Sequence, residues 1–213
     1  MVHLNRITEK WHAPLFRTAL GQYISLLNDP SLNATQLKCS LWDIHFPFHC
    51  LPIWNVIKYL KIDPVTGMKS TVDSIHAKPA YTNKQKHHIS GRFDTALVKE
   101  GGIGNDGTEG GGSDDGPKGT SVVCSSMIPY EIHQFFSFAA YGVVHVKVIF
   151  SIPKHFQAHL FNPGIDVPNH LAYVEWYSPL DRQDPNHKMF KITPLKDSKG
   201  TRICSIILLT DVQ

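Results

Sequence analysis

Residues 39–50, CSLWDIHFPFHC, bring several possible metal ligands into one short stretch of the sequence. The candidate ligands are Cys39, Asp43, His45, His49 and Cys50. Zinc binds thiolate, imidazole and carboxylate groups, but structural zinc sites usually take two pairs of ligands from two separate knuckles. A second knuckle is missing, and the aromatic residues of the stretch indicate instead that Cys39 and Cys50 are buried small apolar side chains. A small metal-dependent enzyme that uses this cluster stays open as the alternative.

The stretch TNKQKHHISGR, residues 82–92, is the most compact basic patch of the chain. Its candidate nucleic-acid-binding residues are Lys84, Lys86, His87, His88 and Arg92. Lysine and arginine side chains neutralise backbone phosphates without reading the base sequence, so the patch predicts a non-specific contact with DNA. The rest of the chain adds little to this prediction, because the net charge is only +3 and the 21 basic and 18 acidic residues are spread along it.

A glycine cluster directly follows the strand-like run FDTALVKE. Gly102, Gly104 and Gly107 have the spacing of a dinucleotide-binding turn, and residues 101–106 match one unit of a calcium-binding β-roll. A dinucleotide turn needs a helix directly after its glycines, yet the chain continues TEGGGSDDGPKG, whose carboxylates also repel phosphate. A β-roll needs several stacked copies, and the sequence holds one. We therefore expect a flexible loop at 100–120, with no cofactor and no small-molecule ligand.

The run YVEWY, which begins at Tyr173, places its side chains on two faces of an expected strand. Because successive residues of a strand point to opposite faces, Tyr173, Glu175 and Tyr177 share one face. Val174 and Trp176 share the other face. One face could be a recognition surface and the other the core, and the alternative for Trp176 is a wall of a methyl-lysine cage. We predict that Trp176 belongs to the core and that the opposite face is a candidate recognition surface.

The motifs of common enzyme classes are missing from the sequence. It contains no G-x-S-x-G, no H-E-x-x-H and no phosphate-binding loop, which favours a protein that is not an enzyme. The four cysteines are far apart and form no C-x-x-C pair, as is typical of reduced thiols inside a cell. No apolar stretch reaches the length of about 18 residues that a membrane span needs. We expect a nuclear or cytoplasmic location and no contact with a membrane.

Helices are predicted near the start of the chain. Apolar residues recur at three- and four-residue spacing over 14–28, which indicates an amphipathic helix that stops before Pro30. Asn33 or Ser31 can cap a second, short helix over 34–41. The two helices form the expected N-terminal helical segment.

Strands are predicted for most of the remaining chain. The candidates are 54–62, 93–99, 144–152, 171–180, 188–195 and 201–212, with a polar connection over 63–90 that contains a short extended piece around 72–76. The alternation of apolar and polar residues is strongest over 144–152, where Ile149 alone breaks it. Short strands joined by turns, with little room for helices after residue 153, predict an α+β fold that is mainly β. Its expected form is a small SH3-like or BAH-like β-barrel, or a curled antiparallel sheet, over 91–213 after an N-terminal segment over 1–62.

Several of these blocks occur in the same order in a known protein family. The blocks LPIWNVIKYLKI, GRFDTALVKEGG, VVHVKVIFSIP, LAYVEWYSPL and RICSIILLTDV resemble the C-terminal region of Plavaka-type transposase-related proteins, which DNA transposons of fungi encode. The resemblance implies that a ribonuclease-H-like catalytic domain with an acidic triad lies upstream, so that this region is not catalytic. The blocks VKVIFSIP, YVEWYSPL and MFKITP are more loosely similar to the barrel of bromo-adjacent-homology chromatin modules.

The resemblance leads to a first hypothesis on function. The chain is expected to be a non-catalytic, transposon-derived module that contacts DNA, chromatin or its parent transposase. It departs from the family where residues 121–140 separate the glycine loop from the next strand. This insertion is either a true protein segment or a translated intron. A degenerate reading frame without selected activity therefore stays open as an alternative.

Overall fold

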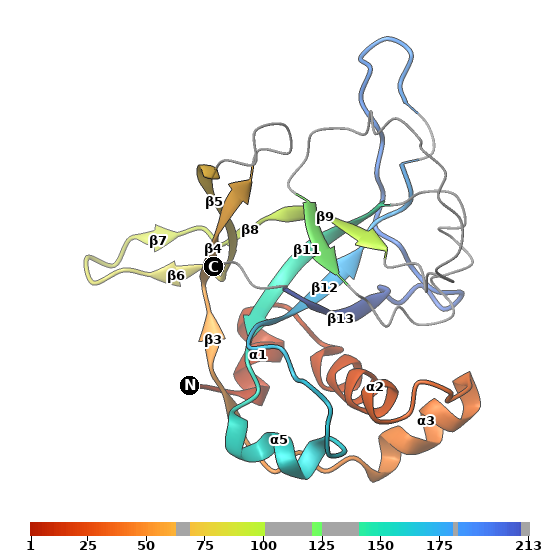
Figure 1. Ribbon diagram of the computed structural model, residues 1–213. Helices are drawn as coiled ribbons and strands as arrows, with labels where there is room; N and C mark the ends of the chain where they lie inside the picture. Colours follow the sequence, from red (N-terminus) through yellow and green to blue (C-terminus); the bar gives the residue numbers. More distant parts are fainter. Residues whose placement is uncertain (63–68, 101–120, 125–140, 181–182, 210–213) are drawn as a thin grey trace.

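A computed structural model describes residues 1–62, 69–100, 121–124, 141–180 and 183–209 (Figure 1). In chain order the elements are β1 (Val2–His3), α1 (Leu4–Lys10), α2 (Phe16–Asn28), α3 (Ala34–Asp43), β2 (Cys50–Leu51), β3 (Ile53–Trp54), β4 (Val56–Ile62), β5 (Lys69–Lys78), β6 (Tyr81–Thr82), β7 (His88–Ile89), β8 (Arg92–Phe93), β9 (Thr95–Glu100), β10 (Ser121–Cys124), β11 (Tyr141–Phe150), α5 (Lys154–Leu160), β12 (Leu171–Trp176) and β13 (Cys204–Leu208). The glycine motifs at 101–120, and most of the insertion after them, lie outside the described residues.

The long strand β11 organises a central sheet with the order β10-β9-β11-β12-β13, and β3 pairs with the end of β11 beside β9. Its register with β12 shifts between Val146 and Val148, so that Lys147 lies in a bulge. A bulge adds one residue and changes the face to which the following side chains point. Val146 and Ile149 therefore contribute to one core cluster and Val148 to the other. The bulge explains why Ile149 breaks the alternation in the sequence.

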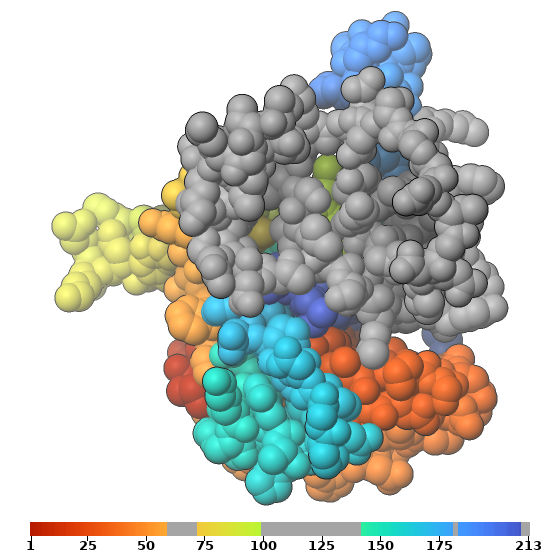
Figure 2. Space-filling view, viewed as in Figure 1, coloured from red at the N-terminus to blue at the C-terminus, as the bar shows by residue number. Residues whose placement is uncertain are grey.

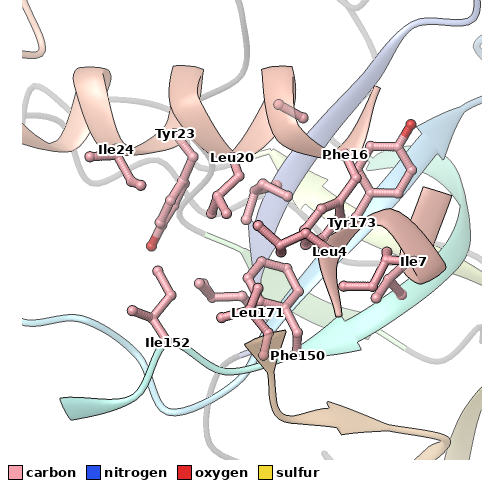
Figure 3. Close-up of a cluster of buried hydrophobic side chains, with 14 of the residues drawn as sticks. Leu4, Ile7, Phe16, Leu20, Tyr23, Ile24, Phe150, Ile152, Leu171 and Tyr173 are labelled. Carbon is pink, nitrogen blue, oxygen red and sulfur yellow. The ribbon is translucent and has the colours of Figure 1, made fainter. Parts of the chain in front are cut away.

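Helices α1 and α2 cover one face of the central sheet and form the larger core cluster with it. In Figure 3, Phe16 and Leu20 of α2 point toward Phe150 and Tyr173 of the strands. The Phe16 ring meets the rings of Phe150 and Tyr173 edge-on, with centroids 5.1 and 5.8 Å apart. Burial of each such side chain contributes about 1.5–3 kcal/mol to stability. The predicted amphipathic helix is thus confirmed, and its apolar face is the one that packs on the sheet.

The second helix, α3, begins where the sequence predicts. The Asn33 side chain accepts hydrogen bonds from the backbone N–H groups of Thr35 and Gln36, both at 3.0 Å. The Gln36 side chain accepts the Asn33 N–H in return at 3.0 Å, which completes a capping box. Of the two caps that the sequence allows, Asn33 is the one used.

The opposite face of the central sheet holds the second core cluster, and Trp176 is fully buried in it, which confirms its prediction as a core residue. The Trp176 indole N–H donates to the Ser205 hydroxyl at 2.8 Å. Gly142 on the neighbouring strand is required here, because a Cβ at this position would lie 2.4 Å from the Trp176 ring.

A second antiparallel sheet, with the order β4-β5-β8, stands beside the central one, and the hairpin β6–β7 extends away from it (Figure 1). The expected polar connection over 63–90 therefore contains a ten-residue strand and a hairpin. Strand β5 pairs with β4 from Val56 to Ile62, so its partner is the preceding strand of the chain. The extended piece predicted around 72–76 is therefore the middle of a longer strand, whose Ile75 and Ala77 are buried in the second core cluster.

The prediction of a mainly β fold with antiparallel sheets is confirmed, but no closed barrel forms among the described strands. The central sheet has a linear order, with β10 and β13 at its ends. Helices α1 and α2 bury one apolar face of the central sheet, which in a closed barrel would be buried in the interior of the barrel.

Two local predictions after residue 153 are wrong. The predicted strand 188–195 makes only isolated bridges, Gln183 with Phe190 and Tyr177 with Pro194, and its apolar residues Met189 and Phe190 are exposed. A seven-residue helix, α5, forms at 154–160, where the sequence predicted little room for a helix. Pro153 precedes it, where a proline is compatible with the start of a helix.

Candidate nucleic-acid interface

The hairpin β6–β7 is built on a turn that Asn83 organises. The Asn83 side-chain oxygen accepts hydrogen bonds from the backbone N–H groups of Gln85 and His87, both at 2.9 Å. The Lys86 N–H donates to the Asn83 carbonyl at 3.0 Å, and Lys86 itself has a φ of 63°. Asparagine side chains commonly form turns of this kind with their own backbone. The turn holds the predicted basic residues at the tip of the hairpin.

The structure brings Lys84, Lys86, His87 and His88 together on this hairpin, and all four are exposed. From Lys78 to Phe93 the chain has four lysine or arginine residues and no acidic residue. The hairpin is the yellow projection in the space-filling view of Figure 2. A basic ribbon that stands clear of the body can approach a nucleic acid without interference from the rest of the protein.

Two apolar side chains lie among these charges, Tyr81 of β6 and Ile89 of β7, and both are exposed. They face each other in the register of the hairpin. The Lys78 ammonium lies 4.3 Å from the centre of the Tyr81 ring. This cation–π contact keeps a positive charge on the exposed aromatic ring at the base of the ribbon.

Arg92, the fifth predicted residue, lies at the root of the hairpin and not at its tip. Its Nε donates to the carboxylate of Asp94 at 3.0 Å. The same carboxylate lies 2.8 Å from Nδ1 of His76 and accepts the His76 backbone N–H at 2.8 Å. Burial opposes ionisation of Asp94, but these hydrogen bonds and the Arg92 charge outweigh it and hold the pKa of Asp94 below its ordinary value. Arg92 is thus partly neutralised and helps to orient the hairpin.

The predicted metal ligands do not come together. In the part of the chain that the structure describes, no three His, Cys, Asp or Glu side chains are arranged to hold a metal ion. Cys39 is exposed on α3, and Cys50 is half-buried in β2, so the prediction of two buried cysteines is wrong. Helix α3 has no buried residue, and Cys39 lies on its solvent side.

The predicted recognition surface of Tyr173, Glu175 and Tyr177 is mostly buried. The three residues share one strand face, as expected, but Tyr173 and Glu175 are only 1% and 8% exposed. Helix α2 covers Tyr173, and Glu175 is paired with Arg202. Tyr177 alone keeps partial exposure, with the Arg202 guanidinium 5.5 Å from its ring centre.

A buried charged cluster that the sequence analysis missed surrounds Glu175, and it consists of His145, Lys147, Glu175 and Arg202. The Glu175 carboxylate accepts hydrogen bonds from Nη2 and Nε of Arg202 at 2.9 and 3.3 Å. Lys147 is 8% exposed, and its ammonium lies 4.5 Å from the centre of the Phe93 ring. No described residue forms a hydrogen bond with that ammonium. The polar alternation of His145 and Lys147 was the available signal, but strand register places His145 opposite Glu175, and the bulge sets the position of Lys147.

Burial controls the protonation of this cluster. Burial lowers the pKa of Lys147, and the nearby Glu175 charge offsets this lowering only in part. It also lowers the pKa of His145, and the Lys147 charge adds to this effect. Burial raises the pKa of Cys204 to about 11, so this thiol stays protonated and unreactive at neutral pH. The cluster therefore supplies a neutral imidazole and a destabilised ammonium. Cys204, which pairs with Glu175 in the strand register, is not an activated nucleophile.

None of the helices among the described residues has the length and apolar character needed to cross a membrane. Comparison with known proteins returned no match to a protein-family model, a curated protein or a solved structure.

Proposed function

We propose that the protein binds DNA through the hairpin β6–β7, as a non-catalytic module of a transposon-derived protein. The observation that supports this proposal is a projecting ribbon whose segment, from Lys78 to Phe93 inclusive, has four lysine or arginine residues and no acidic residue. A two-stranded ribbon fits the major groove of B-DNA, which is about 12 Å wide. The resemblance to transposase-related proteins favours DNA as the nucleic acid.

The chemistry of the ribbon favours contact with phosphates over reading of bases. Lys84 and Lys86 at the tip are flexible point charges, which neutralise phosphates well but specify little. Tyr81 adds an exposed ring near the root. We expect binding that is weak in physiological salt, is insensitive to base sequence and becomes stronger as the salt concentration falls.

The test is the salt dependence of binding to a fluorescently labelled DNA duplex, measured by anisotropy. Each phosphate contact contributes about 0.9 to the slope of log K against log salt. The double variant Lys84→Gln, Lys86→Asn should therefore lower the slope by almost two. Asparagine is chosen for position 86 because it tolerates the positive φ of Lys86.

The matched control is the double variant Lys196→Gln, Lys199→Gln, which removes the same charge from exposed positions on another loop. It should bind DNA like the unmodified protein. Absence of binding by the unmodified protein at low salt would overturn the proposal. Equal losses in the hairpin variant and the control would also overturn it, because net charge alone would then explain the binding.

A further inference from the structure

A pocket of about 450 Å³ lies between α2 and α3, far from the basic hairpin in the chain. Its walls are Arg17, Thr18, Gly21, Lys38, Leu41, Trp42, Ile44 and Phe46. Four of these side chains are large and apolar, two are cationic and none is acidic. A concave apolar surface with a few charged groups is the usual composition of a binding site.

The pocket exists because α3 covers α2 incompletely. The Leu41 side chain of α3 packs over Gly21 of α2, where a Cβ would lie 2.8 Å from Cδ2 of Leu41. The Ser40 hydroxyl donates to the Ser25 hydroxyl at 2.9 Å and fixes α3 against α2. Yet α3 has no buried residue, and Trp42 is 85% exposed. The half-buried Leu41 contacts α2, and Trp42 beside it is left open toward solvent.

Exposure of the Trp42 side chain to water is energetically unfavourable. Hydration of its large apolar surface is unfavourable, and a partner that covers it gains most of that free energy. Tryptophan and arginine are also the residues that most often dominate binding energy at interfaces. Trp42 and Arg17 both line this pocket.

The charges of the pocket indicate which partner it suits. Lys38 is exposed, and Arg17 uses one of its nitrogen atoms to donate to the Asn5 side chain at 3.0 Å. No ion pair with a described residue engages either cation. With two free cations and no carboxylate in the lining, a partner with negative charge is favoured and a basic one is repelled.

We propose that this pocket binds a short acidic peptide segment of another protein that carries bulky apolar side chains. The apolar side chains of the peptide would cover Trp42 and Phe46, while the carboxylates of the peptide would pair with Arg17 and Lys38. Amphipathic segments commonly bind in this way, with apolar anchors in a groove and charges at the rim. The site would connect the module to a partner protein independently of DNA binding.

The test uses two synthetic, fluorescein-labelled peptides of about a dozen residues. One has Leu and Phe at helical spacing among Asp and Glu residues, and the other replaces those acids by Lys. Anisotropy should show binding of the acidic peptide at least about tenfold tighter than that of the basic peptide. In a Trp54→Phe background, emission of the exposed Trp42 should shift to the blue on binding, since Trp11 and Trp176 are already buried.

The variants Trp42→Ala and Lys38→Glu should each weaken binding of the acidic peptide by about tenfold or more. Both side chains are exposed, so neither change should affect folding. The controls are Phe190→Ala and Lys199→Glu, which alter an exposed aromatic residue and an exposed lysine elsewhere and should leave binding unchanged.

Three outcomes would overturn the proposal. They are absence of binding at millimolar peptide, equal binding of both peptides, and binding that Trp42→Ala does not weaken. Sedimentation of the protein alone provides a further test. A dimer that Trp42→Ala dissociates would show that a second copy of the chain occupies the pocket, which contradicts the proposed peptide.

Discussion

The side chain of His76 and the carboxylate of Asp94 lie 2.8 Å apart, and this contact joins strand β5 to the end of β8. The Asp94 backbone N–H also donates to the His76 carbonyl at 2.9 Å, and the Asp94 carbonyl accepts the Val146 N–H of the central sheet at 3.0 Å. Asp94 thus links the hairpin, the small sheet and the central sheet. The orientation of the proposed DNA-binding ribbon depends on this residue.

Replacement of Asp94 by Ala should therefore destabilise the protein. The change leaves the partly buried His76 backbone N–H without its acceptor, at a cost of about 1–3 kcal/mol. The midpoint of urea unfolding measures this effect. Asp184→Ala, at an exposed turn with similar side-chain to backbone hydrogen bonds, is the control and should cost less. Equal losses would contradict a special role for Asp94.

Acid should weaken the same contact. Because the pKa of Asp94 is lowered in the folded protein, the carboxylate stabilises the fold above its unfolded pKa of 3.8. This contribution is lost as the pH falls below about 4 and through the lower folded pKa. Urea midpoints between pH 6 and pH 2.5 should fall less steeply for Asp94→Asn than for the unmodified protein. Parallel curves would contradict the prediction.

His145 should make the fold sensitive to milder acid. Its pKa is lowered from 6.5 mainly by burial, so below pH 6.5 the unfolded chain binds a proton that the folded chain resists. Stability should therefore decrease from about pH 6.5 downward until His145 is protonated in the folded state as well. The variant His145→Gln should remove this decrease. An unchanged pH profile in that variant would count against the prediction.

Removal of the charge of Lys147 and removal of the charge of Glu175 should have different effects on the stability of the protein. Lys147→Met removes a buried ammonium that no described residue bonds, and it should be neutral or stabilising. In the unmodified protein, stability should rise with pH between the lowered folded pKa of Lys147 and its unfolded pKa of 10.5. Lys147→Met should remove this rise. Glu175→Gln leaves Arg202 and Lys147 without a counter-charge and should cost about 3 kcal/mol. Thermal unfolding of both variants tests the contrast, and a costly Lys147→Met would contradict it.

Two glycine substitutions should also differ in their effect on stability. Gly142→Ala forces a methyl group against the rigid Trp176 ring and should cost about 1–3 kcal/mol. Gly21→Ala meets only the flexible ends of the Leu41 and Ile44 side chains, and alanine favours a helix over glycine by about 1 kcal/mol. Gly21→Ala should thus be neutral or stabilising. Urea unfolding measures both, and similar losses would contradict the assigned packing.

The sequence by itself determined the features that depend on near neighbours in the chain. The apolar spacing of α2, the Asn33 cap and the alternation in β11 all follow from local geometry, and each is found in the structure. The positive charge of the stretch around Lys84 is likewise a property of sequence alone. Such features need no knowledge of which segments meet.

Tertiary structure decided what lies opposite each residue. Alternation shows that Tyr173 and Glu175 share a face, but only the packing of α2 shows that Tyr173 is buried beneath a helix. In the same way, Lys147 lies near Glu175 because strand register and a bulge place it there. Burial and pairing arise from contacts between distant segments, and a local pattern contains no information about them.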